Sequence, residues 1–202
     1  MDKLEFFKEL YYKETDRKNN IISSFSTPIG IISALVAGIF YSLTTFDFSF
    51  YLMLSLFFVG LVLWSVTMLF IAIYHLIKAL SNFQNGFTYA YLSNADNLYN
   101  YYTQLKNYNL QHKIYDSSNE EFDEYILNEL IQATALNQKN NDNKMHHKFL
   151  CSKYMTSSFL VLCVVTVPYG INFGIKKTKQ KFQNVSINST SKNKKNYILI
   201  LP

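Results

Sequence analysis

Hydrophobic positions are concentrated in three long runs, and polar stretches separate these runs. The runs cover about residues 22–43, 50–73 and 154–175. An α-helix rises about 1.5 Å per residue, so about 20 apolar residues cross a hydrocarbon core about 30 Å thick. Each run is long enough to do this. The pattern therefore predicts three transmembrane helices, the first two joined as a hairpin by the short link 44–50.

The N-terminal polar stretch has helical periodicity. Within residues 1–21, Leu4, Phe7 and Tyr11 recur on one face, which predicts an amphipathic helix. We expect its apolar face to pack against the other cytoplasmic helices, and the alternative is that it lies in the membrane interface. Pro28 either starts a separate helix or kinks one that is continuous with the amphipathic helix.

The central polar region, residues 79–153, is predicted to form cytoplasmic helices. Two of them are expected to start at capping boxes, which begin at Ser93 and Ser118. The second helix loses its apolar stripe beyond Ala135. We expect the stretch that follows to be solvated or to face a polar partner.

These elements together predict an all-α integral membrane protein. Its expected parts are a cytoplasmic amphipathic helix (1–21), a two-helix transmembrane hairpin (22–78), a cytoplasmic helical region (79–153), a third transmembrane helix (154–175) and a basic disordered tail (176–202). The tail is expected to be disordered because it is rich in Lys, Ser, Thr and Asn.

Within the first apolar run, a small residue stands at every fourth position. We call this set the small-residue ladder; it consists of Ser26, Gly30, Ala34, Gly38 and Ser42. Small residues at this spacing let another helix backbone come close. We expect the second transmembrane helix to be the main partner, with Ser55 and Ser65 opposite the ladder. A second subunit is the other candidate, and the two can coexist.

The net charge of +5 comes almost entirely from lysine, because Arg17 is the only arginine. A protein that reads nucleic acid usually has more arginine, so no nucleic-acid partner is expected. Lysines beside apolar runs indicate membrane topology, and they place the N-terminus and residues 79–153 in the cytoplasm. The basic tail conflicts with this rule if the third helix crosses the membrane, which we expect. In the alternative, that helix breaks at Pro168 and Gly170 and returns the tail to the cytoplasm.

No pattern of reactive residues points to catalysis, so we expect neither an enzyme nor a cofactor. Cys151 and Cys163 form no disulfide framework, and the adjacent His146 and His147 lack a third metal ligand and are expected to be solvated. The central parts of the apolar runs also lack Asp, Glu, Lys and Arg, which argues against an ion-coupled transporter.

Two stretches, "ELYYKETDRKNNIISSFSTPIGIISAL" and "NELIQATALNQKNNDNKMHHKFL", carry a resemblance. They resemble small uncharacterised bacterial inner-membrane proteins, of the kind found in anti-phage defence loci. The resemblance implies a protein that oligomerises and permeabilises the inner membrane when a sensor fires. This chain has no ligand-binding domain fused to its spans, so the trigger is open.

Two functional hypotheses follow. The first is an oligomeric bacterial membrane effector or pore-forming subunit, with the lipid bilayer and further copies of the chain as partners. The alternative is a non-conducting membrane anchor that docks a soluble cytoplasmic protein through its polar helices.

Overall fold

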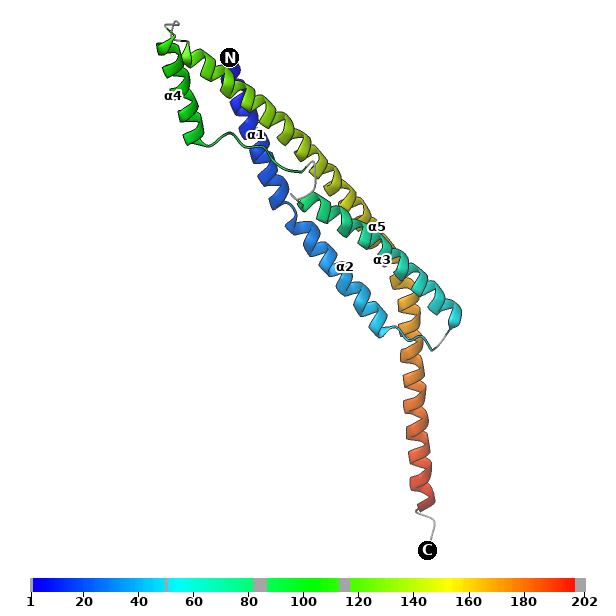
Figure 1. Ribbon diagram of the computed structural model, residues 1–202. Helices are drawn as coiled ribbons and strands as arrows, with labels where there is room; N and C mark the ends of the chain where they lie inside the picture. The colour runs from blue at the N-terminus through cyan, green and yellow to red at the C-terminus, as the bar shows by residue number, and fades with distance from the viewer. Residues whose placement is uncertain (1, 50, 82–86, 113–116, 199–202) are drawn as a thin grey trace. The chain divides into compact units, whose positions relative to one another are not determined.

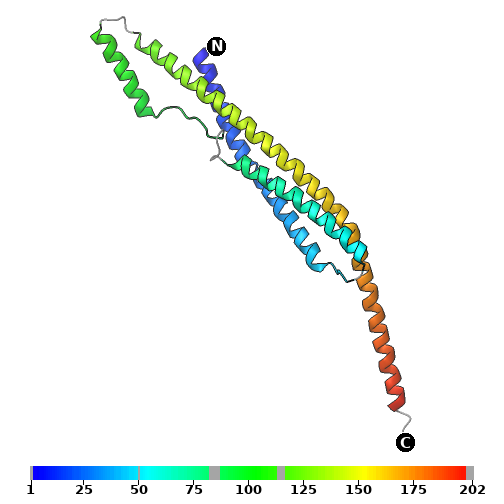
Figure 2. The ribbon, with the colours of Figure 1, turned by 45° about the vertical axis from the view of Figure 1, so that its right-hand side comes forward.

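The computed structural model describes residues 2–49, 51–81, 87–112 and 117–198, with side chains up to residue 179 (Figures 1 and 2). Within these ranges all regular secondary structure is α-helical. The helices are α1 (Lys3–Ser23), α2 (Ser26–Thr45), α3 (Leu52–Leu80), α4 (Ala95–Gln111) and α5 (Ser118–Ile198).

Three helical segments are long and apolar enough to cross a membrane. They are Lys3–Thr45, which combines α1 and α2, then Leu52–Leu80 and Ser118–Lys179. The predicted all-helical class with three apolar helices is therefore confirmed. It was predictable because apolar length and helical periodicity are local properties of the sequence.

A two-residue turn separates α1 from α2. Ser24 closes α1, since its N–H bonds to the carbonyl of Asn20, and α2 begins at Ser26. Pro28 falls in the first turn of α2, where a missing N–H costs no helical hydrogen bond. Of the two alternatives for Pro28, the structure therefore shows the separate helix.

The polar helix, the third apolar run and the tail form one helix, α5. The tail was expected to be disordered from Lys176, but the structure continues the helix to Ile198, through Pro168 and Gly170. Extending an existing helix needs no new nucleus, and Lys and Gln favour helix while no Gly or Pro follows Gly174 before the helix ends. The helix break at Pro168, which was the alternative to a third helix that crosses the membrane, is not observed.

Both predicted capping boxes need correction. Helix α4 has Asn94 at its N-cap without a side-chain cap bond, and the hydroxyl of Ser93 donates instead to Glu129 of α5. At the start of α5 it is Ser117 that donates to Glu121. Ser118 is buried and accepts a hydrogen bond from Asn109. Tertiary contacts thus take up the hydroxyls that local spacing assigned to caps.

The chain divides into two compact units. Unit 1 comprises Met1–Ile29 and Ile73–Ser152, and unit 2 comprises Gly30–Ala72 and Lys153–Pro202. In unit 1, α1 lies against α5 (Figure 1). Tyr11 of α1 is buried against Leu130 and Ala133 of α5. The predicted packing of the amphipathic helix on other polar helices is thus what the structure shows.

In unit 2, α2, α3 and α5 pack through faces on which a buried residue recurs every three or four positions. On α3, for example, this face includes Phe58, Val62, Ser65 and Leu69. Ser65 and Ser158 of α5 exchange hydrogen bonds through their hydroxyls, which lie 2.9 Å apart. Near the α2–α3 link, the rings of Phe46 and Phe58 stack 3.9 Å apart. Spacing of this kind is typical of helices that pack side by side.

Candidate functional site: a polar interface in unit 1

Four polar residues of α5 occupy the buried face that Leu130 and Ala133 begin. We call them the polar stripe; their exposed fractions are Asn137 3%, Asn140 0%, Asn141 0% and Lys144 1%. This stretch was expected to be solvated or to face a polar partner. Solvation is wrong, and the polar partner is the chain itself, namely α1 and the segment between α3 and α4.

That segment, residues 87–93, has no helix or strand, and we call it the linker. The side chain of Asn137 bonds both backbone groups of Ala90, with its Oδ1 accepting from the N–H and its Nδ2 donating to the carbonyl, each at 2.9 Å. Asn140 donates to the carbonyl of Thr88. The hydroxyl of Tyr89 donates to Oδ1 of Asn141 at 2.6 Å. Three successive linker residues are therefore held by three asparagines of α5.

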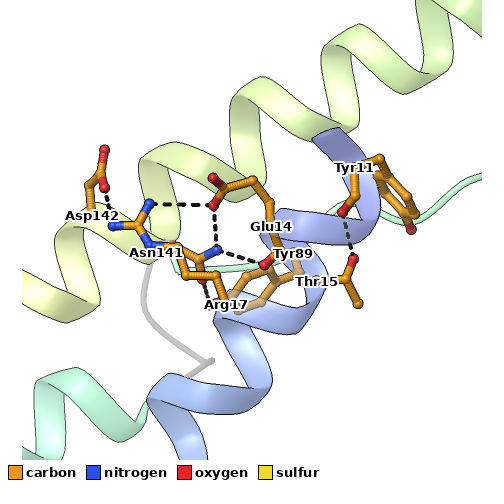
Figure 3. A network of polar contacts seen from close by, with 7 residues as sticks. All are labelled: Tyr11, Glu14, Thr15, Arg17, Tyr89, Asn141 and Asp142. Carbon is orange, nitrogen blue, oxygen red and sulfur yellow. Dashed lines mark hydrogen bonds and ion pairs between the residues drawn. The ribbon is translucent and has the colours of Figure 1, made fainter. Parts of the chain in front are cut away.

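Asn141 also connects the stripe to α1 (Figure 3). Its Nδ2 donates to the backbone carbonyl of Glu14 at 2.9 Å and to Oε2 of the same residue at 2.8 Å. Arg17 contacts Glu14 at 3.4 Å and donates to Asp142 of α5 at 2.7 Å. Because buried polar groups need partners, this network supplies the contacts that an apolar core would not.

Two ammonium groups lie close to the ring of Tyr89. Nζ of Lys18 is 4.6 Å from the ring centre and Nζ of Lys144 is 5.0 Å from it, which are cation–π distances. Burial, with the neighbouring Tyr91 and Glu14, raises the pKa of Tyr89 to about 12. Burial, with the nearby Lys18, lowers the pKa of Lys144. The Tyr89 hydroxyl therefore stays protonated and keeps donating to Asn141 at neutral pH.

An open groove of about 750 Å³ lies beside this network, lined by residues of α1 between Glu9 and Ile21 and by Met145 and Lys148 of α5. It carries cations and acids together. One of its cations, Lys148, donates to Ser24 at 2.6 Å. The groove therefore offers no concentrated charge of one sign for a ligand.

A histidine pair joins α3 to α5 in the same unit. Nδ1 of His75 lies 3.0 Å from Nδ1 of His147, and Phe87 of the linker packs on His147 with ring centres 5.9 Å apart. His147 is thus part of a helix contact and not simply solvated. Among the described residues, no group of three His, Cys, Asp or Glu side chains is placed to hold a metal ion.

The small-residue ladder lies elsewhere, along α2, and the structure divides it. Ser26, Gly30 and Ala34 are exposed, and a Cβ on Gly30 would meet no described atom within 4 Å. Gly38 is half-buried, with Leu162 of α5 3.4 Å from the place of a Cβ, and Ser42 is buried. The expected pairing of Ser65 with the ladder is wrong, because Ser65 bonds Ser158 of α5.

Sequence reasoning missed the polar interface because it stopped at the end of the apolar stripe. The spacing nevertheless continues, since Asn137, Asn141 and Lys144 follow Leu130 at positions that stay on the same helix face. The sequence therefore did contain a signal for this interface. It is a helix face that continues at the same spacing while its side chains change from apolar to amide.

Comparison with known proteins gives no match: no family model, no curated protein and no solved structure is significantly similar to the chain.

Proposed function

We propose that the chain is a subunit of a homo-oligomeric membrane effector, whose apolar helices associate and whose unit 1 receives a cytoplasmic signal. The observation that carries the proposal is the exposed part of the ladder, Ser26, Gly30 and Ala34. Large apolar side chains gain little by leaving lipid, whereas small residues let a neighbouring backbone come into van der Waals contact. Since these three positions are exposed in the described part of the chain, a second copy is the partner we infer.

In this proposal the assembled helices perturb a bacterial inner membrane when unit 1 changes state. The resemblance to small bacterial inner-membrane proteins supports the membrane and the action, including a role in antiviral defence. The distribution of lysines supports a cytoplasmic N-terminus.

The test is the oligomeric mass of detergent-purified protein by light scattering, with Gly30→Leu and a matched control. Gly60→Leu is that control, because Gly60 of α3 is also exposed with no described atom within 4 Å of a Cβ. We expect an oligomer in the wild type and in Gly60→Leu, and a smaller species in Gly30→Leu. Gly38→Leu is a poor probe, since it would press on Leu162 of the same chain. Equal masses in all three proteins would contradict the proposal.

A non-conducting membrane anchor is the second candidate, and unit 2 supplies the observation that favours it. Ser65 bonds Ser158, and Nδ2 of Asn172 donates to the carbonyl of Asp47 at 2.7 Å, so these polar groups are used within the chain. Side chains bonded in this way do not face a water-filled pore. Dye entry and membrane depolarisation after overexpression separate the two candidates, because a pore leaks and an anchor does not.

A further inference from the structure

The contacts between α5 and the linker are those of a bound peptide. Asn137 bonds the N–H and the carbonyl of Ala90 together, which is how a neighbouring strand pairs with one residue. The contact of Asn140 with Thr88 also uses a backbone carbonyl. Any segment of suitable conformation provides these groups, whatever its side chains, so this part of the interface recognises a backbone.

At the polar stripe itself, side-chain recognition involves two tyrosines, while Phe87 packs on His147 and Leu92 packs against the cluster around Tyr11. The ring of Tyr89 is within cation–π distance of the ammonium groups of Lys18 and Lys144, and its hydroxyl bonds Asn141. The hydroxyl of Tyr91 accepts from Nζ of Lys18 at 2.7 Å while the rest of this side chain is exposed. A ligand for this interface therefore needs a tyrosine in the position of Tyr89 and gains from a second one two residues later.

The contacts between the linker and the polar stripe allow another segment to replace the linker. Its contacts with the polar stripe are hydrogen bonds and cation–π contacts, and water or another peptide can replace each hydrogen bond. Two buried atoms of the same face, Oγ1 of Thr134 and Oδ1 of Asn140, have no hydrogen-bond partner among the described residues. These atoms would gain partners when the linker leaves and water or a different segment enters.

We propose that the polar stripe of α5 is a peptide-binding site, that the linker is its resident intramolecular ligand, and that a tyrosine-bearing segment of a partner protein displaces the linker. Displacement would break the bond from Tyr89 to Asn141, the same amide that holds Glu14 of α1. The idea that this displacement is the cytoplasmic signal rests on the proposed function. The binding of a peptide to the polar stripe does not depend on it.

A labelled peptide of the linker sequence FTYAYLS, residues 87–93, tests the site in the full-length chain in detergent. The protein is the Tyr89→Ala variant, whose own linker has lost its main anchor. Fluorescence anisotropy should show saturable binding to this variant. The wild type should bind the peptide more weakly, because its attached linker competes at a high effective concentration.

Two matched substitutions test whether the peptide binds at the polar stripe. Adding Asn137→Leu to the Tyr89→Ala variant should weaken binding about tenfold, by removing two backbone hydrogen bonds. Adding Gln138→Leu, at the neighbouring exposed position, should leave it unchanged. The peptide FTAAYLS should bind poorly to every variant. Circular dichroism confirms that each variant keeps its helix content.

The proposal is overturned if FTYAYLS fails to bind the Tyr89→Ala variant, or if binding is the same with Asn137→Leu. Neither readout depends on the oligomeric mass. A failed peptide experiment therefore leaves the Gly30→Leu result standing, and a monomeric protein can still bind the peptide.

Discussion

The polar contacts of unit 1 converge on Asn141, whose one amide serves three groups. It donates to the backbone and the carboxylate of Glu14 and accepts from the hydroxyl of Tyr89. Aspartate would offer no donor to Glu14, and leucine would offer neither a donor nor an acceptor. An asparagine at this position thus joins α1, the linker and α5 at a single point.

Truncating the side chain of Asn141 should destabilise the folded protein. In Asn141→Ala, the buried residue Glu14, only 6% exposed, keeps Arg17 as a partner of its carboxylate but loses the nearer donor. We expect the free energy of unfolding to fall by about 2–3 kcal/mol, since a buried charged group is left poorly satisfied. Thermal unfolding in detergent, followed by circular dichroism, measures the loss. Gln138→Ala on the exposed face should change little, and equal losses in the two variants would count against the network.

At the scale of elements, α5 buries the same helix face along its length, and the chemical character of the buried side chains changes from one part of the helix to the next. The buried positions run from Leu130 through the polar stripe to Cys151, and continue through Ser158 to Asn172. Along this one face, the buried side chains are therefore first apolar, then amides, and finally those that pack against other apolar helices.

The contact between α3 and α5 should depend on pH. His147 faces His75 and Lys78 of α3, His146 of its own helix and Phe87 of the linker. Burial first, and then these cationic neighbours, lower the pKa of His147 below its ordinary value of 6.5. The unfolded chain consequently takes up a proton first as the pH falls. The stability that the neutral pair contributes is present above the ordinary pKa of 6.5, and it is lost as the pH falls below that value and through the lowered pKa of the folded state.

Comparison of the wild type with His147→Asn, which cannot take up this proton, isolates the effect. Between about pH 7.5 and about pH 5.5, the Tm of the wild type should fall about 2–4 °C further than that of the variant, which corresponds to about 1 kcal/mol in a chain of this length. The same Tm shift in both proteins would show that other groups set the pH dependence.

At the scale of the whole molecule, the orientation in the membrane is still a prediction from the lysines. It places the N-terminus and residues 79–153 in the cytoplasm and the α2–α3 link outside. If α5 crosses the membrane, its basic end lies outside as well.

Single cysteines test this orientation in a chain whose own Cys151 and Cys163 are replaced by Ala. Ser49→Cys lies in the link, Asn128→Cys in unit 1 and Thr178→Cys beyond the last apolar run, and all three positions are exposed. A membrane-impermeant maleimide should label Ser49→Cys and Thr178→Cys in intact cells, and Asn128→Cys only after permeabilisation. Labelling of Asn128→Cys in intact cells would reverse the orientation, and protection of Thr178→Cys would place the tail inside.

The sequence alone determined that the protein is all-helical with three apolar helices, and that α1 has an apolar face formed by Leu4, Phe7 and Tyr11. These are properties of neighbouring residues, since a turn of helix brings together positions three and four apart. The end of α5 was mispredicted from composition, because a helix that already exists continues into residues that would not start one.

The tertiary structure decided which faces are buried and by what. Asn137 and Asn141 look solvated until the linker, about fifty residues earlier, and α1, over one hundred residues earlier, are placed against them. In the same way, the ladder of α2 reads as one continuous surface in the sequence. Only the position of α5 separates Gly38, which packs on Leu162, from Gly30, which stays open. Such partners lie far away in the chain, and no local pattern identifies them, because a polar face is stable in water and against a polar neighbour alike.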